Sequence, residues 1–222
     1  MSKPLENTAS CRRNPEKTRQ TLLRHAFEQI HQQGFRAVSL DAILRDTGVT
    51  KGALYHHFPN KQALGYAVVD EVVAGILQTV WIDPVVNSDD PVTALQDIIR
   101  LTGENMSLDE LKLGCPLNNL SQEMSALDEG FRLRLDKIYE NWRTSLSAAL
   151  ENGINRNTVV SNIDPDTTAA FLVAALEGCI GMAKNAQSMR ILDRCGAGIL
   201  SYLESLRPAR EQPMKADPKE VA

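Results

Sequence analysis

Hydrogen-bonding and small side chains gather between residues 39 and 61 in a spacing suited to binding a polyanion. Lys51 can donate to the edge of a guanine, Gly52 allows the backbone to approach the bases, and Ala53 can contact a thymine methyl group. The hydroxyl, imidazole and ammonium groups on either side are of types that bind phosphate. The residues predicted to contact nucleic acid are Ser39, Thr50, Lys51, Gly52, Ala53, Tyr55, His56 and Lys61.

Two short helices joined by a tight turn are predicted to hold these side chains. Apolar residues recur at helical spacing along the first helix, at about 39–46. Gly48 stands where the chain must reverse, a position that often needs a positive φ. Thr50 can cap the second helix, at about 51–57, and Pro59 ends it. An apolar inner face and a cationic outer face are typical of a recognition helix that enters the major groove of DNA.

The run from Thr50 to Leu64 resembles the DNA-binding domain of the TetR family of bacterial transcriptional regulators. It reads Thr-Lys-Gly-Ala-Leu-Tyr-His-His-Phe-Pro-Asn-Lys-Gln-Ala-Leu, and the similarity extends over roughly the first 75 residues. A weaker similarity, to a loop–helix junction of some members, lies at Gly114-Cys-Pro-Leu-Asn-Asn-Leu. The resemblance implies that Tyr55, His56 and Lys61 hold phosphates. It also implies an all-helical C-terminal domain that dimerises and usually binds a small inducer.

Charge is distributed unevenly along the 222-residue chain. The formal net charge of −4 argues by itself against binding nucleic acid. Residues 1–65, however, have a net charge of +5, because ten lysines and arginines face five acids, whereas the remainder has −9. All four histidines also lie in the basic part. The asymmetry predicts a small polyanion-binding module joined to an acidic domain.

Metal, cofactor and membrane signals are weak in this sequence. The cysteines, Cys11, Cys115, Cys179 and Cys195, show no metal-ligand spacing. His56 and His57 are adjacent, so their side chains point about 100° apart on a helix. We therefore expect no metal and no cofactor. The N-terminus is polar, with no signal peptide, and no apolar run is long enough to span a bilayer. These features predict a soluble cytoplasmic protein with reduced thiols, not bound to a membrane.

The remaining pattern predicts an all-α protein, with an N-terminal three-helix helix-turn-helix domain and a larger helical ligand-binding and dimerisation domain, of about nine helices altogether. The first helix starts at Asn14-Pro15-Glu16 and ends at Gly34; the fourth runs from Asn60 to near Asp83-Pro84, before a loop at 84–91. Later helices are expected at about 92–108, 116–126, 128–152, 165–186 and 188–206. The predicted division is a mobile arm at 1–13, the DNA-binding domain at 14–75, the second domain at 76–206 and a disordered tail at 207–222.

The last two predicted helices carry apolar residues with alternating steps of 3 and 4, as in a coiled-coil seam. We expect them to pair with their copies in a four-helix dimer bundle, where Gly178 allows close backbone approach. Packing within one chain is the alternative. The predicted interface comprises Leu172, Gly178, Cys179, Met182, Leu192, Cys195, Ile199 and Tyr202.

A ligand pocket is predicted among the middle helices, although the same residues could form plain core. Its candidate residues are Trp81, Met106, Cys115, Asn118, Asn119, Met124, Phe131, Tyr139, Trp142, Phe171 and Glu177. Cys115 precedes Pro116 and is expected at the start of a helix, where free amides favour a thiolate. A small buried capping residue is the alternative for Cys115.

The sequence thus favours a homodimeric repressor that binds double-stranded, near-palindromic operator DNA and is released by a small inducer. One alternative is a redox- or electrophile-sensing regulator acting through Cys115; another is a ligand-independent DNA-binding protein. An enzyme is disfavoured, because no Ser/His/Asp order, metal spacing or phosphate loop is present and all histidines lie in the DNA-binding part.

Overall fold

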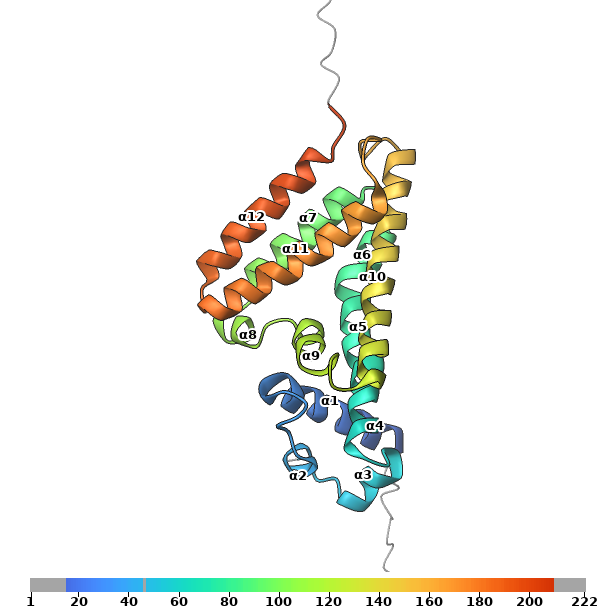
Figure 1. Cartoon of the computed structure of the whole chain (residues 1–222), viewed down its shortest axis with the longest axis vertical. Coiled ribbons are helices and arrows are strands. Elements are labelled where there is room, and N and C mark those ends of the chain that lie inside the picture. Colours follow the sequence, from blue (N-terminus) through green and yellow to red (C-terminus); the bar gives the residue numbers. More distant parts are fainter. Residues whose placement is uncertain (1–14, 46, 210–222) are drawn as a thin grey trace, which may run out of the picture. The chain divides into compact units, whose positions relative to one another are not determined.

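The computed structural model describes residues 15–45 and 47–209, and within these ranges every regular element is a helix (Figure 1). The all-α prediction is therefore confirmed. The arm predicted at 1–13, Cys11 and most of the predicted tail lie outside the described residues. The helices are α1 (Pro15–Gln33), α2 (Leu40–Leu44), α3 (Lys51–His57), α4 (Lys61–Ala67), α5 (Ala74–Leu77), α6 (Asp83–Val86), α7 (Pro91–Asn105), α8 (Leu108–Leu113), α9 (Pro116–Met124), α10 (Glu129–Asn155), α11 (Pro165–Ala186) and α12 (Met189–Ser205).

Local capping explains where several helices begin. Ser39, Thr50, Asn60 and Asp164 each accept a hydrogen bond from the backbone amide three residues later, at 3.1, 3.2, 2.7 and 2.7 Å. Each cap satisfies an amide that has no partner within its helix. The starts of α2, α3, α4 and α11 are therefore determined by nearby sequence.

Helices α4 to α6 form one helical segment, Lys61–Val86, with wider π-helical turns at η1 (Val68–Val73) and η2 (Gln78–Ile82). The sequence predicted an end near Asp83-Pro84. The helix instead continues to Val86, because Pro84 lies in the first turn of α6, where its missing N–H leaves no hydrogen bond unmade. The connection to α7 is therefore shorter than the predicted loop at 84–91.

Helix α8 was not predicted, although its sequence contains a signal for it. The Ser107 hydroxyl accepts from the Glu110 amide at 3.2 Å, and the Glu110 carboxylate accepts from the Ser107 amide at 2.8 Å. This reciprocal pair is a capping box. The spacing Ser-x-x-Glu therefore marks a helix start that apolar periodicity alone did not detect.

The described residues divide into two compact units. Unit 1 comprises residues up to Leu77 together with Leu113–Tyr139, and unit 2 comprises Gln78–Lys112 together with residues from Glu140 onward. This division differs from the predicted boundary near residue 75, because 113–139 packs with the N-terminal helices.

The core of unit 1 explains why 113–139 belongs there. The ring of Phe131, fully buried, lies 4.6 Å from Phe35 and 5.0 Å from Tyr66, centroid to centroid. The Glu123 carboxylate accepts from the amides of Phe35 and Arg36 at 2.9 and 2.8 Å. Phe131, predicted as a pocket residue, is therefore a core residue of unit 1.

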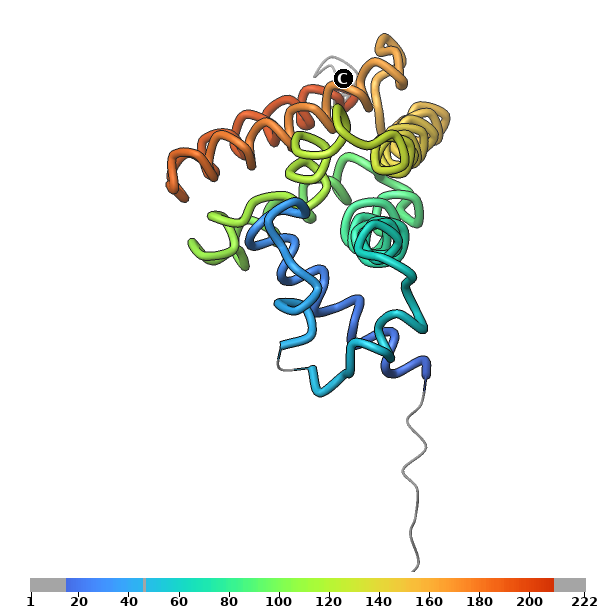
Figure 2. The backbone as a smooth tube through the Cα atoms, turned by 60° about the horizontal axis from the view of Figure 1, so that its bottom comes forward, coloured from blue at the N-terminus to red at the C-terminus, as the bar shows by residue number. Residues whose placement is uncertain are grey.

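In unit 2, α11 and α12 run side by side as an antiparallel pair (Figures 1 and 2). Phe171, near the start of α11, meets Tyr202, near the end of α12, with ring centroids 4.9 Å apart. Helix α7 packs against α12. The core of this unit includes Leu95 of α7, Leu172 of α11 and Leu203 of α12.

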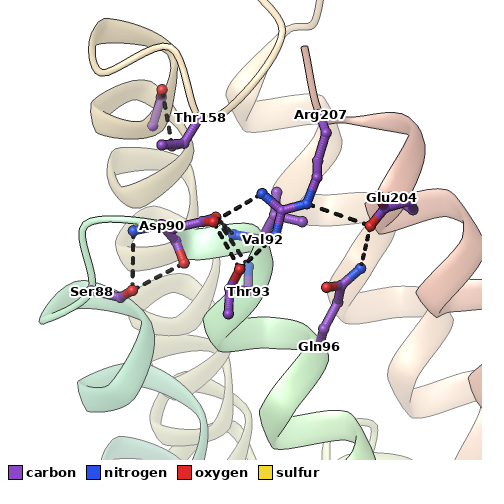
Figure 3. A network of polar contacts seen from close by, with 9 residues as sticks. Ser88, Asp90, Val92, Thr93, Gln96, Thr158, Glu204 and Arg207 are labelled. Atoms are coloured by element: carbon purple, nitrogen blue, oxygen red, sulfur yellow. Dashed lines mark hydrogen bonds and ion pairs between the residues drawn. The ribbon is translucent and has the colours of Figure 1, made fainter. Parts of the chain in front are cut away.

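Arg207, just after α12, forms hydrogen bonds with residues at the start of α7 (Figure 3). Its guanidinium donates to Asp90 Oδ2 at 2.9 Å and to Thr93 Oγ1 at 2.6 Å. The neighbouring Glu204 accepts from Gln96 Nε2 at 3.0 Å. Burial tends to raise the pKa of Asp90, but hydrogen bonds from Arg207 and Thr93 outweigh it and lower that pKa below its ordinary value. Arg207, placed by the sequence in a disordered tail, is therefore held in the fold.

Two helical segments, Lys61–Val86 and Pro165–Ala186, are long and apolar enough to cross a membrane by length and composition alone. The sequence reading did not anticipate this. Each segment buries one face in the protein core, with residues such as Val69 and Leu172, and the first also carries Asp70 and Glu71. Core helices of globular domains share these properties, so the finding is weak support for a membrane span.

Candidate nucleic-acid interface and ligand cavity

Helix α3 turns its apolar side chains inward and its polar ones outward. Leu54 and Phe58 are 0% and 3% exposed, whereas Tyr55 is 46% exposed. The turn before the helix depends on Gly48, whose φ of +65° lies in the left-handed region. Of the predicted contacts, Ser39, Thr50, Lys51, Gly52, Tyr55 and His56 are exposed, and Ala53 and Lys61 are half-buried.

Lys51 begins α3 with its ammonium group near an acid. Lys51 Nζ lies 3.2 Å from Asp41 Oδ1, and both side chains are more than half exposed. Such an exposed ion pair contributes little stability. Lys51 can therefore exchange Asp41 for a base edge at small cost. In the part of the chain that the structure describes, no atom lies within 4 Å of a Cβ built on Gly52, so the start of α3 presents bare backbone to a ligand.

Lys61 is held more firmly than Lys51. Its Nζ donates to the Arg36 carbonyl oxygen at 3.2 Å and lies 4.7 Å from the centroid of the Phe35 ring. Burial lowers the pKa of Lys61, and the nearby Glu123 carboxylate opposes that change. An ammonium group has three donors, so Lys61 can anchor the start of α4 and still donate to a phosphate.

Arg19 supports α3 from two directions, and the sequence analysis did not identify it. Its guanidinium pairs with the Glu71 carboxylate at 2.5 Å and lies 5.3 Å from the centroid of Phe58, the residue that ends α3. The hydrogen bond from Arg19 lowers the pKa of Glu71 despite partial burial. The pair joins residues 52 positions apart, so no local sequence pattern could reveal it.

A second support, around Asp128, was also missed. Asp128 Oδ1 accepts from the Tyr66 hydroxyl at 2.7 Å and from the Phe131 amide at 3.0 Å, so it caps α10. The Tyr66 hydrogen bond is the largest effect lowering the pKa of Asp128. Arg134 stacks 4.2 Å from the centroid of Tyr66 and donates to Asp70 at 2.9 Å. These contacts fix the helix that follows α3.

Unit 2 contains a cavity of about 270 Å³ between α7, α11, α12 and η2. Its walls are mainly apolar, with Arg100, Glu104 and Asp193 as charged groups. Arg100 is already paired with Asp97 at 3.3 Å. Such a cavity suits a small, largely apolar molecule with a few polar groups. The lining residues are Trp81, Ile99, Arg100, Thr102, Gly103, Glu104, Met106, Leu176, Cys179, Ile180, Leu192, Asp193, Gly196, Ala197, Ile199 and Leu200.

The predicted pocket residues are scattered by comparison. Trp81 and Met106 line the cavity, and Trp142 packs on Trp81 with ring centroids 5.5 Å apart. Glu177 is buried elsewhere on α11, and Phe171 is 51% exposed. Aromatic and methionine content identifies buried residues but not which unit they join. The others, Cys115, Asn118, Asn119, Met124, Phe131 and Tyr139, belong to unit 1.

The predicted dimer seam is split between two faces. Leu172, Cys179 and Ile199 are buried within the chain, and Cys179, Leu192 and Ile199 line the cavity. Cys195 and Tyr202 are half-buried. Gly178 and Met182 are exposed, on the same side of α11 as Phe171. Steps of 3 and 4 locate an apolar stripe but do not distinguish packing within a chain from packing between chains.

Cys115 lies at the start of α9, as the sequence predicted, and is half-buried. Its side chain makes no capping hydrogen bond. A ring nitrogen of His31 lies 2.8 Å from the carbonyl oxygen of the preceding Gly114. Gly114 adopts a φ of +72°, which allows the sharp entry into α9. No group of three potential metal ligands occurs among residues 15–45 and 47–209.

Sequence comparison matches both parts of the chain to known families. Residues 22–68 match a family described as bacterial regulatory proteins, tetR family, and residues 91–199 match one described as a tetracyclin repressor-like C-terminal domain. The transcriptional regulator AcuR of Cereibacter sphaeroides is 31% identical over 74% of this chain and 75% of its own length. The transcriptional repressor NemR of Escherichia coli K12 is 28% identical over 84% of this chain and 94% of its own length.

Solved structures support the same relationship. A crystal structure of the regulatory protein TetR from Rhodobacter sphaeroides has a TM-score of 0.73 and 26% identity, covering 83% of this chain and 98% of that one. The reduced form of E. coli NemR has a TM-score of 0.72 and 27% identity, covering 83% and 96%. With the exposed, capped helix-turn-helix and the mainly apolar cavity described above, these matches place the chain in the TetR family of bacterial transcriptional regulators.

Proposed function

We propose that this protein is a cytoplasmic, homodimeric repressor that binds near-palindromic operator DNA through α3 and leaves it when a small molecule enters the cavity of unit 2. The observation that carries the proposal is the pairing of an exposed cationic recognition helix with a mainly apolar cavity in one chain. Regulators of this family bind DNA, and their repressor and inducer roles are extended here to this chain.

The predicted DNA contacts support the first half of the proposal. Lys51, Gly52 and Ala53 begin α3 and face the bases, whereas Tyr55, His56 and Lys61 hold phosphates. Two copies of α3 related by a two-fold axis would reach half-sites one helical turn apart, about 34–36 Å. The operator is therefore expected to be near-palindromic.

The exposed face of α11 supports a dimer. Phe171 and Met182 are 51% and 56% exposed, and no atom of the described residues lies within 4 Å of a Cβ built on Gly178. Large apolar side chains beside bare backbone favour close packing against a second copy of the chain. The refined interface centres on Phe171, Gly178 and Met182 instead of the whole predicted seam.

Helical continuity supports coupling between ligand and DNA. The segment Lys61–Val86 starts directly after the recognition helix and carries Trp81, a wall residue of the cavity. A ligand that moves Trp81 would bias the orientation of this helix and hence of α3. The protein then leaves its DNA because the ligand binds one orientation of the helix more tightly than the other.

Tryptophan fluorescence tests the proposal directly. Trp81 and Trp142 are the only tryptophans in the sequence, so Trp142→Phe leaves Trp81 as the sole reporter. Small apolar compounds that change Trp81 emission should also release the protein, in a gel-shift assay, from the intergenic DNA upstream of its own gene. A compound that fills the cavity yet never releases DNA would contradict the inducer role.

A cavity-filling variant sharpens this test. A Cβ on Gly196 would lie 4.0 Å from Ile99 across the cavity, so Gly196→Leu should abolish the ligand response while DNA binding persists. Gly75→Leu, at an open position in unit 1, is the matched control. An unchanged response in Gly196→Leu would place the inducer elsewhere.

Thiol sensing at Cys115 is a second candidate function. It is supported by the position of Cys115 at the start of α9 and by the similarity to NemR, whose crystal form is described as reduced. Cys115 should then react with iodoacetamide faster than Cys179, and its modification should release DNA. A Cys115→Ser protein that still responds to oxidant would leave Cys115 as a structural residue.

A further inference from the structure

Cys179 of α11 and Cys195 of α12 face each other across the antiparallel pair. The contact between Phe171 and Tyr202 sets the register of the two helices. Cys179 lies eight residues after Phe171, and Cys195 lies seven residues before Tyr202, so both reach about the same level at 1.5 Å per residue. The two thiols are joined by a side-chain hydrogen bond.

The two thiols differ in their surroundings. Cys179 is 8% exposed, whereas Cys195 is half-buried. Burial, reinforced by the hydrogen bond to Cys195, raises the pKa of Cys179 to about 12. Cys179 therefore keeps its proton near neutral pH and donates it to the sulfur of Cys195. Cys195 is the more accessible sulfur and the better placed nucleophile.

A small oxidant reaches Cys195 through the exposed part of its half-buried side chain, and the pair borders the cavity at Cys179. Cys179 forms part of its wall, together with Gly196, the residue that follows Cys195. A volume of about 270 Å³ is several times the roughly 30 Å³ that one water molecule occupies. A molecule as small as hydrogen peroxide can therefore enter.

We propose that Cys179 and Cys195 form an oxidisable dithiol, which a peroxide converts to an intrachain disulfide between α11 and α12. The Cys195 thiolate attacks one peroxide oxygen, the O–O bond breaks, and hydroxide leaves, giving a sulfenic acid. The Cys179 sulfur then attacks the Cys195 sulfur. An S–S bond forms, the S–O bond breaks, and the leaving hydroxyl takes the Cys179 proton as water. Two electrons pass from the thiols to the peroxide.

Bond formation must draw the two sulfurs together. A disulfide needs an S–S distance of about 2.05 Å, which is shorter than a hydrogen bond between two sulfurs. The cavity beside Cys179 then narrows. Disulfide formation itself does not depend on the proposed function, but the consequence for ligand uptake does rest on it.

Disulfide mapping tests the chemistry. A full-length Cys11→Ser/Cys115→Ser protein, which keeps only the pair, is reduced, treated with hydrogen peroxide and digested after alkylation. We expect the loss of both free thiols and a linked peptide containing Cys179 and Cys195 in one chain. Cys179→Ser should stop at a sulfenic acid on Cys195, trapped by dimedone, and Cys195→Ser should react at least tenfold more slowly.

Other products would overturn the inference. They include a Cys195–Cys195 bridge between two chains, or over-oxidised Cys195 beside free Cys179. Because Cys→Ser changes at buried Cys179 can disturb packing, Cys179→Ala is made in parallel, and both should fold as judged by circular dichroism.

A second measurement separates this inference from the proposed function. Operator binding is measured on the reduced double variant, and Trp81 emission is compared before and after oxidation in the same protein carrying Trp142→Phe. Failure of the reduced protein to bind its operator overturns the repressor proposal and leaves the disulfide intact. Absence of the disulfide overturns the proposal of an oxidisable dithiol and does not affect the proposal of operator binding.

Discussion

The helix-turn-helix of unit 1 and the α7–α11–α12 region of unit 2 use their side chains in opposite ways. In α3, Leu54 and Phe58 face inward, while Lys51 and Tyr55 face solvent. In the second region, inward residues such as Cys179 surround a cavity, and the outward face of α11 is apolar. The first region is suited to a large charged ligand at its surface, the second to a small ligand inside and an apolar partner outside.

The two regions therefore respond to different physical variables. Surface contacts with phosphates depend on charge and salt, whereas the cavity and the α11 face depend on side-chain volume. Charge substitutions should therefore affect α3 and spare α11, and volume substitutions should do the reverse.

The largest effect is expected at the exposed face of α11. Gly178→Leu adds a bulky side chain where a second copy is proposed to pack, but where no atom of residues 15–45 and 47–209 lies within 4 Å of the new Cβ. The protein should become monomeric and lose at least ~100-fold in operator affinity, about 3 kcal/mol. Light scattering after size exclusion and gel-shift titration measure both.

Gly75→Leu is the matched control for the dimer prediction. Gly75 is also an open helical glycine, but it lies in α5 of unit 1. It should remain dimeric and bind DNA normally. A dimeric Gly178→Leu protein with normal affinity would move the interface off α11.

The next effect is expected inside unit 1. A Cβ on Gly65 would lie only 2.8 Å from Phe131 Cζ and closer still to the Phe35 ring. Gly65→Ala should therefore lower the free energy of unfolding of unit 1 by about 3 kcal/mol, as overpacking of a rigid aromatic core does. Thermal denaturation followed by circular dichroism provides the measurement.

Gly52→Ala is the control for this overpacking. Its Cβ meets no atom within 4 Å, so helix propensity should make the protein up to ~1 kcal/mol more stable. Its DNA affinity should nevertheless fall, because the backbone can no longer approach the bases. Equal stability of the two alanine variants would contradict the packing described at Gly65.

The two regions also differ in how far the sequence could predict them. The starts of α2, α3 and α4 follow from Ser39, Thr50 and Asn60, whose hydroxyl or amide groups act within three residues. The fold class follows from apolar periodicity over whole helices. Even the missed α8 had a local signal, the capping box of Ser107 and Glu110.

The cavity could not be predicted in this way. Its walls combine α7, α11 and α12 with Trp81, and their spacing depends on tertiary packing between distant segments. The supports at Arg19 and Asp128 are likewise non-local, since each joins residues more than 50 positions apart. The spacing of 3 and 4 predicted the apolar stripes of α11. It did not predict whether a stripe packs within the chain or against a second copy.

A smaller effect is expected where α12 meets α7. Arg207→Ala removes the hydrogen bonds to Asp90 and Thr93 and should destabilise unit 2 by about 2 kcal/mol near pH 7. The folded-state pKa of Asp90 lies below its ordinary 3.8. The contribution of the Arg207–Asp90 pair to the stability of unit 2 is therefore present when the pH is above that ordinary value. It is lost as the pH falls through the folded-state pKa of Asp90.

Urea unfolding of the wild type and of Arg207→Ala at pH 7, 5 and 3.5 measures the difference between their free energies of unfolding. The gap between wild type and Arg207→Ala should persist at pH 5 and shrink at the lowest pH. Lys184→Ala is a control on the same unit, away from Asp90. A gap that stays constant from pH 7 to 3.5 would show that Arg207 acts through packing and not through the Asp90 carboxylate.

Lys51 should control base preference with an effect of about tenfold. Lys51→Ala removes a donor proposed to meet a guanine edge, so affinity should fall for the cognate site and less for mutated sites, about 1.4 kcal/mol at one base position. Asp41→Asn is the control, because it frees Lys51 from its ion pair and should bind slightly more tightly. Uniform weakening across all sites would assign Lys51 to phosphate.

The smallest effect, and the sharpest separation of charge from packing, is expected at Lys61. Its ammonium group donates to Arg36 O, lies 4.7 Å from the centroid of the Phe35 ring and faces the proposed phosphate. Lys61→Met keeps most of the stem and removes the charge, so it should lower the slope of log affinity against log salt by about one and weaken all sequences equally. Lys61→Ala should show the same change in slope and, in addition, a lower melting temperature. Fluorescence anisotropy from 50 to 200 mM salt distinguishes these outcomes. An unchanged slope in both variants would assign Lys61 wholly to anchoring α4, and phosphate binding would then rest on Tyr55 and His56.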